Sequence, residues 1–361
     1  MTSSIVNRLE WSTVILNRWV APIIFLIGFI GNFFNLMIFT RKDFFKKSIS
    51  QYFLAASINN ITMFFIGLST RIIESGFQIS IFGGDSNVYC KIRTYFVYTA
   101  FAISNWFLVF ASLDRFYSTN QSAIKRQRFC SNRMAFKLIC LIVIGCILTH
   151  IHIIIYYKYI YYENLNNQSI LICTSNNGMY TMFFSFFILM FYSLLPPILM
   201  LLIGLLTINN VRKFRQRINP SRIQTLLTRD AHQLIKTLSV QITLLIILTT
   251  PHSCYWLYMG FTSEKNSIKT TLILEYEKFI LNIVRLILYM NYGSGFYIQI
   301  KIFSQQIDCG EKLTVIISII LPFFVVFSLF ICWIMRPYPQ QASNVIEFQI
   351  RQQIDFSKFQ Q

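Results

Sequence analysis

Charged residues are scarce in this chain, and acidic residues are the scarcest of them. Only 13% of the 361 residues are Asp, Glu, Lys or Arg, and only 14 are Asp or Glu. A soluble globular protein has about 25% charged residues. Hydrophobic residues make up 55% of the chain and aromatic residues 17%. This composition excludes an ordinary soluble domain.

The common signatures of catalytic and metal sites are also missing. The chain has no Walker-type glycine loop and no zinc-binding spacing of Cys and His,. His150 and His152 are two residues apart, a spacing that directs them to different faces of a helix and makes a poor metal pair. We therefore expect no enzyme activity, no cofactor and no metal. A transporter is the weaker alternative, because residues 19–150 and 180–300 show no paired broken helices.

Long apolar runs dominate the chain. A bilayer core of about 30 Å needs roughly 20 apolar residues in helical conformation. Seven segments meet or approach this length, at about 19–40, 49–72, 92–113, 134–157, 180–208, 233–258 and 273–299. The sequence therefore predicts an all-α integral membrane protein, a seven-transmembrane helix bundle in the lipid bilayer. A β-barrel would instead show alternating strands of about 10 residues.

The net charge of +18 is unevenly distributed. Fourteen Lys and Arg residues fall within 41–47, 125–133 and 212–229, whereas five fall within 1–18, at 158 and within 265–269. Positive charge is enriched in cytoplasmic loops, so we expect an extracellular N-terminus, a short extracellular tail at 1–18 without a signal peptide, and a multi-pass protein of the plasma membrane. This distribution favours the anionic inner leaflet over a nucleic-acid partner.

Two of the eight cysteines, Cys90 and Cys173, fall on the predicted outer side of the membrane. Two thiols in an oxidising compartment favour a disulfide, and two unpaired surface cysteines are the alternative. Asn167 begins an Asn-Gln-Ser sequence in the same outer loop, which predicts N-glycosylation.

The third apolar run ends in adjacent opposite charges. Asp114, Arg115 and Phe116 follow Cys90 by 24 to 26 residues, at the predicted inner end of the span. One interpretation is an interfacial ion pair that anchors the helix end. The other is a switch, in which Asp114 holds Arg115 in one state and releases it to a cytoplasmic partner in another.

Further landmarks favour the second interpretation. They are Gly31-Asn32 in the first span, Leu54-Ala55 in the second, Pro251 in the sixth and Asn291 in the seventh. With Cys90, Cys173 and the Asp-Arg-Phe segment, these residues resemble the rhodopsin-like (class A) G-protein-coupled receptors over residues 19–300, and the spacing of the spans resembles divergent peptide-receptor-like members.

The resemblance implies a receptor that transmits an extracellular ligand signal to a heterotrimeric G protein by a conformational change. Asp114, Arg115 and Phe116 would form the coupling switch. Val97 stands where amine receptors of the family carry Asp, so a peptide or another ligand without an amine is expected. The candidate ligand-binding residues are Arg93, Tyr98, His252, Trp256 and Arg285. The alternatives are a packing role for His252 and, for Arg285, snorkelling or an ion pair with Glu74, Glu275 or Glu277.

Several family residues are replaced. The second-span Asp of the family corresponds to Ile58 or Asn59, which argues against a sodium pocket like the family's. Leu248-Thr249-Thr250-Pro251 replaces the family's sixth-span Cys-Trp-x-Pro, so the usual tryptophan is absent, and the seventh-span Asn-Pro becomes Asn291-Tyr292. A receptor-like protein that no longer signals is therefore the alternative function.

The resemblance ends near Ile300, and residues 301–361 are atypical. Cys309 is a candidate for palmitoylation. Residues 313–335 form a candidate eighth hydrophobic segment, which is long enough to cross the membrane. A re-entrant loop and a read-through into an intron are the alternatives.

Overall fold

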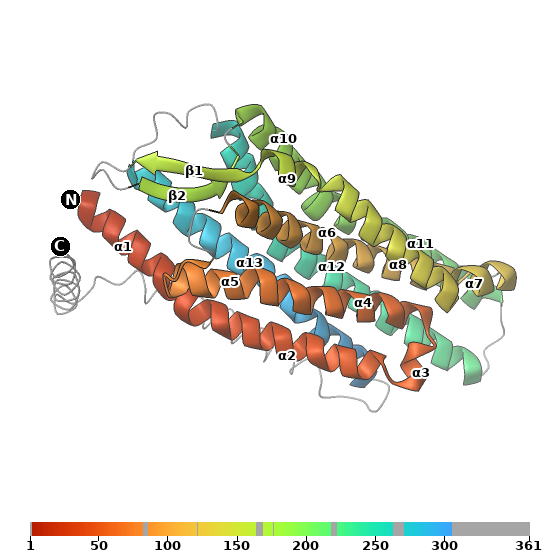
Figure 1. The fold of residues 1–361 in the computed structure, drawn as a ribbon. Helices are drawn as coiled ribbons and strands as arrows, with labels where there is room; N and C mark the ends of the chain where they lie inside the picture. Colours follow the sequence, from red (N-terminus) through yellow and green to blue (C-terminus); the bar gives the residue numbers. More distant parts are fainter. Residues whose placement is uncertain are drawn as a thin grey trace. The chain divides into compact units, whose positions relative to one another are not determined.

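The computed structural model describes residues 2–81, 86–120, 122–163, 169–175, 177–217, 222–262 and 271–304. Figure 1 shows the arrangement of their helices and of one β-hairpin. Asn167, Cys309 and the hydrophobic segment 313–335 lie outside the described residues, so the three predictions that concern them stay predictions.

The described secondary structure is almost entirely helical. The α-helices are α1 (Thr2–Ile15), α2 (Ala21–Phe39), α3 (Lys42–Phe45), α4 (Ser48–Met63), α5 (Ser69–Arg71), α6 (Asn87–Ser118), α7 (Ala123–Phe129), α8 (Asn132–Thr149), α9 (His152–Tyr156), α10 (Gly178–Ile188), α11 (Leu195–Arg217), α12 (Arg222–Thr262) and α13 (Thr271–Ser304). The π-helical turns η1 (Leu16–Val20), η2 (Phe64–Leu68), η3 (Ile72–Gly76) and η5 (Leu189–Leu194) connect or extend some of them, and strands β1 (Lys158–Glu163) and β2 (Ser169–Thr174) pair antiparallel.

Six helical segments within the described residues are long and apolar enough to cross a membrane. They are Ser4–Phe39, Ser48–Gly76, Asn87–Ser118, Asn132–Tyr156, Gly178–Val211 and Ser239–Thr262. Helix α13 is not among these six; it is 34 residues long, contains Arg285 and packs against both α2 and α12. The predicted all-α membrane bundle is confirmed.

Helix α6 forms the core of this bundle. It packs against α4, α8 and α11, and buried residues recur along it from Cys90 to Arg115. By contrast, α2 exposes large apolar side chains such as Leu26, Phe33 and Met37. A surface of this kind is suited to lipid, because the bilayer interior is as apolar as a protein core.

The N-terminal residues are helical, whereas the sequence predicted a short tail at 1–18. Helix α1 begins at Thr2 and continues through η1 into α2, because no glycine or proline interrupts the chain before Pro22,. It packs against α13. The Arg18 Nε donates a 2.8 Å hydrogen bond to the carbonyl of Gly76, so the structure shows no break at residue 18.

Gly76 permits a close approach between the first two spans. A Cβ atom at this position would lie 2.9 Å from the backbone carbonyl carbon and oxygen of Asn17. Backbone atoms cannot rotate away, so we expect Gly76→Ala to destabilise the bundle by about 1–3 kcal/mol.

The matched control is Gly145→Ala, because a Cβ at Gly145 in α8 would have no neighbour within 4 Å. That variant should be neutral or more stable by up to about 1 kcal/mol. Thermal unfolding of the two purified variants tests the difference, and equal midpoints would show that the Gly76 contact is not limiting.

Candidate functional site

The two ends of the bundle differ in composition. We call the end with Cys90 and the β1–β2 hairpin the disulfide end, and the opposite end, with α3 and α7, the Arg115 end (Figure 1). The candidate ligand-binding residues belong to the disulfide-end half, and the predicted coupling residues lie at the Arg115 end.

The structure contains the predicted disulfide between Cys90 and Cys173. Cys90 lies in the first turn of α6, and Cys173 pairs with Tyr159 across the hairpin. The Asn87 Oδ1 also accepts a 2.8 Å hydrogen bond from the backbone N–H of Tyr159. The hairpin is therefore attached to the end of α6 by one covalent bond and one hydrogen bond.

An aromatic cluster lies below this end, between α6, α10 and α12. The ring centroid of Tyr98 is 5.2 Å from that of Phe184 and 6.3 Å from that of Trp256. The Trp256 Nε1–H donates a 3.2 Å hydrogen bond to His252 Nε2. His252 is buried, with 2% of its surface exposed, and its contact with Trp256 fits the interpretation of His252 as a hydrogen-bonded packing residue.

His150 and His152 do not lie as their sequence spacing suggested. The rings of His150 and His152 lie next to each other, with centroids 6.3 Å apart. They can do so because α8 ends at Thr149 and a turn precedes α9. Each ring is bonded to a tyrosine: His150 Nε2 to the Tyr192 hydroxyl at 2.7 Å, and His152 Nδ1 to that of Tyr180 at 2.8 Å. The prediction of different faces was wrong, and the histidines join α8 and α9 to the α10–η5 segment.

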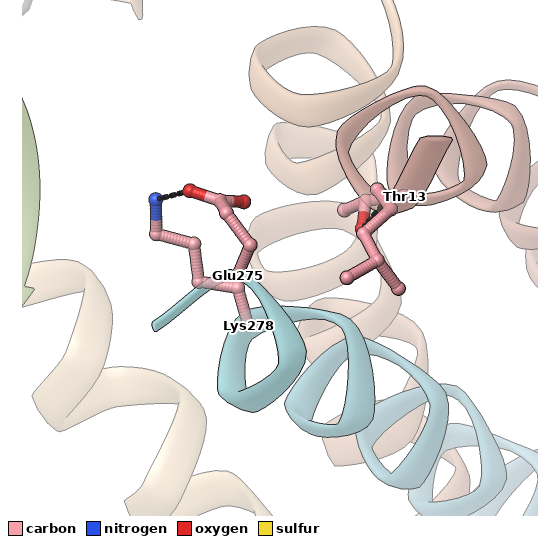
Figure 2. Close-up of polar contacts among 4 residues, drawn as sticks. Thr13, Glu275 and Lys278 are labelled. Atoms are coloured by element: carbon pink, nitrogen blue, oxygen red, sulfur yellow. Dashed lines mark hydrogen bonds and ion pairs between the residues drawn. The ribbon is translucent and has the colours of Figure 1, made fainter. Parts of the chain in front are cut away.

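Arg285 has no ion pair with a described carboxylate. Glu275 is paired with Lys278 at 2.7 Å (Figure 2), and Glu277 accepts a 3.1 Å hydrogen bond from the Tyr258 hydroxyl. The electrostatic neighbours of Arg285 are instead Tyr98, Arg93, Tyr289 and Tyr255. Glu275 and Glu277, two of the three predicted ion-pair partners of Arg285, therefore contact Lys278 and Tyr258 instead.

Arg71 forms a group with Arg93 and Arg285, which the sequence does not predict. The charge of Arg71 acts on those of Arg285 and Arg93. Arg93 is fixed by a 2.7 Å bond from Nε to the Thr70 hydroxyl and a 3.1 Å bond from Nη2 to the Gly67 carbonyl. The only sequence signal for Arg71 was its place at the end of a long apolar run.

An uncharged polar cluster joins four helices in the middle of the bundle. The Asn60 Nδ2 donates to Asn32 Oδ1 at 3.1 Å and to the Tyr292 carbonyl at 3.3 Å, and Ser104 Oγ donates to Asn60 Oδ1 at 2.6 Å. The Asn59 Nδ2 donates to Ser104 Oγ at 2.7 Å. Helices α2, α4, α6 and α13 thus meet at neutral groups.

Asn60, together with Asn59, faces this cluster, whereas Ile58 is 50% exposed on the outside of α4. The family resemblance predicts Ile58 or Asn59 at this position and does not predict Asn60, because a shift of one residue on a helix rotates the side chain by about 100°. The donor set contains amides, a hydroxyl and a backbone carbonyl but no carboxylate. These residues therefore do not fit the family's sodium pocket.

Asp114 and Arg115 do not form an ion pair, although both side chains are buried. Asp114 Oδ1 accepts a 2.7 Å hydrogen bond from Ser48 Oγ. The Arg115 guanidinium lies 5.6 Å from the centroid of the Phe53 ring, and its Nε and Nη1 have no hydrogen-bond partner. Phe116 is partly buried and contacts Tyr117, with ring centroids 5.3 Å apart.

The expectation that Asp114 neutralises Arg115 by direct contact was therefore wrong for this conformation. Adjacent residues on a helix point about 100° apart and do not face each other. Asp114 turns toward α4, where Ser48 satisfies it, and Arg115 is left with buried donors that have no acceptor.

Cys130, beyond the Arg115 end of α6, should be an unreactive thiol. Its Sγ lies 3.4 Å from the Asp114 carbonyl, and burial, followed by the Asp114 charge, raises the pKa of Cys130 to about 11. The reactive species is the thiolate, so at pH 8 alkylation should be roughly a hundredfold slower than for a thiol of pKa 9. The rate of iodoacetamide labelling measured from pH 7 to 11 tests this.

Labelling of Cys130 should rise continuously up to about pH 11, since the raised pKa keeps the thiol protonated below that value. Asp114→Asn should accelerate the reaction only slightly, because burial is the larger cause. A labelling rate that levels off near pH 9 would contradict the buried environment of this thiol.

The comparisons with known proteins agree with this architecture. The family model described as 7 transmembrane receptor (rhodopsin family) matches residues 31–291. This range includes the disulfide, the Asp114-Arg115-Phe116 segment and the residues of the central polar cluster except Tyr292. No curated protein matches the chain.

Proposed function

Because the chain belongs to the rhodopsin family of seven-transmembrane receptors, we propose that it transmits the binding of an extracellular, non-amine ligand to a heterotrimeric G protein. The disulfide end faces the extracellular side of the plasma membrane, and the Arg115 end faces the cytoplasm. The ligand, a peptide or another molecule without an amine anchor, binds near Arg93, Tyr98, Trp256 and Arg285. The mechanism is a shift between bundle conformations, without covalent chemistry.

The observation that carries this proposal is the state of Arg115. Its guanidinium is buried beside Phe53, and two of its nitrogen atoms have no partner. An unsatisfied buried cation is costly, so a cytoplasmic protein that offers backbone carbonyls or carboxylates stabilises the conformation in which Arg115 reaches out. The central polar cluster connects α6 with α2, α4 and α13, and it provides contacts through which the two ends are coupled.

Nucleotide exchange on G proteins tests this function. Membranes with the full chain should stimulate GTP-analogue binding when screened with a peptide library, and Arg115→Ala should reduce the stimulation to background at equal surface expression. Arg41→Ala is the matched control, because Arg41 is an exposed cation at the same end of the bundle.

Two results would count against the proposal. Equal stimulation by wild type and Arg115→Ala would remove Arg115 from the coupling mechanism. No exchange above that of empty membranes, with any G-protein class, would favour a receptor-like protein that no longer signals, consistent with the replaced sixth-span tryptophan.

A further inference from the structure

Three arginines come together from three spans in the disulfide-end half of the bundle. Arg71 ends α5, Arg93 lies in the second turn of α6, and Arg285 lies in the first half of α13. All three side chains are partly buried. Their charges repel one another, since Arg71 is acted on by Arg285 and Arg93, and Arg285 by Arg93.

The charge of this group is not balanced by the described residues around it. Glu74 acts on Arg71, but more weakly than Arg285 and Arg93 do, and the other groups that act on Arg285 and Arg71 are tyrosines. Within the described residues, no carboxylate lies within ion-pair distance of any of the three guanidinium groups. Buried charges of one sign without a partner are strongly unfavourable, and in membrane proteins such residues mark functional sites.

The guanidinium N–H groups of these arginines can also donate hydrogen bonds to a ligand. Arg93 is held by Thr70 and Gly67, which fixes one guanidinium in place. Arg71 Nε is buried and has no hydrogen-bond partner, and neither Arg71 nor Arg285 donates a side-chain hydrogen bond to a described residue. A guanidinium presents its donors as a planar fork that matches the two oxygens of a carboxylate or phosphate.

We propose that Arg71, Arg93 and Arg285 bind an anionic group of the ligand, a carboxylate or a phosphate. This inference rests on the proposed receptor function and specifies the chemistry of its ligand. The apolar body of the ligand contacts Tyr98, whose ring also packs against Trp256. The neutral Tyr98 hydroxyl lies within electrostatic range of the Arg285 guanidinium, so an acid with an aromatic or aliphatic body satisfies both neighbouring surfaces.

Binding to the purified full-length chain in lipid nanodiscs tests the site without a G protein. The probes are phenylacetate, 3-phenylpropionate and indole-3-acetate, each paired with its carboxamide, together with inorganic phosphate and sulfate at constant ionic strength. The acids should raise the midpoint of thermal unfolding, and their carboxamides should not. Arg285→Gln and Arg71→Gln should each weaken acid binding about tenfold or more, the loss of one charge-assisted contact.

Lys278→Gln is the matched control on α13, because the charge of Lys278 is already paired with Glu275; this variant should bind the acids as wild type does. Without ligand, Arg285→Gln and Arg71→Gln should unfold at the wild-type temperature or above it, since each removes a repelling charge. A structural ion pair would give the opposite shift.

The proposal is overturned if acids and carboxamides shift unfolding equally, or if no acid or inorganic anion distinguishes wild type from Arg285→Gln. Arg115→Ala separates the two proposals. Arg115→Ala should bind the acids with wild-type affinity while nucleotide exchange is lost. A wild-type chain that binds the acids but never stimulates nucleotide exchange would retain the site and reject signalling. If Arg285→Gln and Arg71→Gln leave peptide-stimulated nucleotide exchange unchanged, signalling is retained and the anion site is rejected.

Discussion

Replacing both cysteines of the disulfide, in a Cys90→Ala/Cys173→Ala variant, should leave little protein at the cell surface. The bond joins residues separated by 83 positions, and closing a loop of this length restricts the unfolded chain by about 4–5 kcal/mol in the chain-entropy estimate. This value is an upper bound, because inserted helices already restrict the unfolded state. Since many proteins are stable by only about 5–15 kcal/mol, a large part of the folded population should be lost.

The same variant allows the loss of surface protein to be compared with the stability of the helical core. After the loss of the disulfide, the 2.8 Å hydrogen bond from Tyr159 to Asn87 still holds the hairpin, so the α-helical core should persist at a lower unfolding temperature. Surface biotinylation and thermal unfolding measure both effects. Cys254→Ala, which changes an exposed thiol on α12, should behave as wild type. Alkylation of both Cys90 and Cys173 without reduction, detected by mass spectrometry, would contradict the bond.

The second large effect is expected from Asn60→Leu in the central polar cluster. Asn60 exchanges three hydrogen bonds with other spans, with Asn32, Ser104 and the Tyr292 carbonyl. Such bonds average about 0.6 kcal/mol in membrane proteins, but a buried acceptor left without a donor costs about 1–3 kcal/mol. Leucine leaves Asn32 Oδ1 without this donor, so we expect a loss of about 2–4 kcal/mol.

Thermal unfolding of purified protein measures this loss. Thr62→Leu is the control, because Thr62 is only half-buried on the same helix and its hydroxyl makes a solvent-exposed bond to its own helix, at the Ile58 carbonyl; it should change stability by less than about 0.5 kcal/mol. Equal midpoints for Asn60→Leu and Thr62→Leu would mean that the cluster does not stabilise the bundle.

The amino-acid sequence alone predicted the features that depend on local length and composition. Apolar runs of about 20 residues can only be satisfied in a bilayer as helices, so the membrane bundle followed from hydropathy. The pairing of Cys90 with Cys173 followed from charge asymmetry, which placed both on one side of the membrane. The Asp114-Arg115-Phe116 segment at its distance from Cys90, together with Cys173 and the seven predicted spans, indicated the family.

Only the tertiary structure decided which side chains on each helix point toward the neighbouring helices. The sequence could not choose between Ile58 and its neighbours, place Arg71 beside Arg93 and Arg285, or show that Asp114 contacts Ser48 instead of Arg115. Each of these contacts joins different spans, and each depends on helix rotation. The π-helical turns η2 and η3 in the second span widen the helix locally and change which residues beyond them face inward. A rotation of this kind has no signature in composition, so the packed bundle alone fixes which polar groups meet.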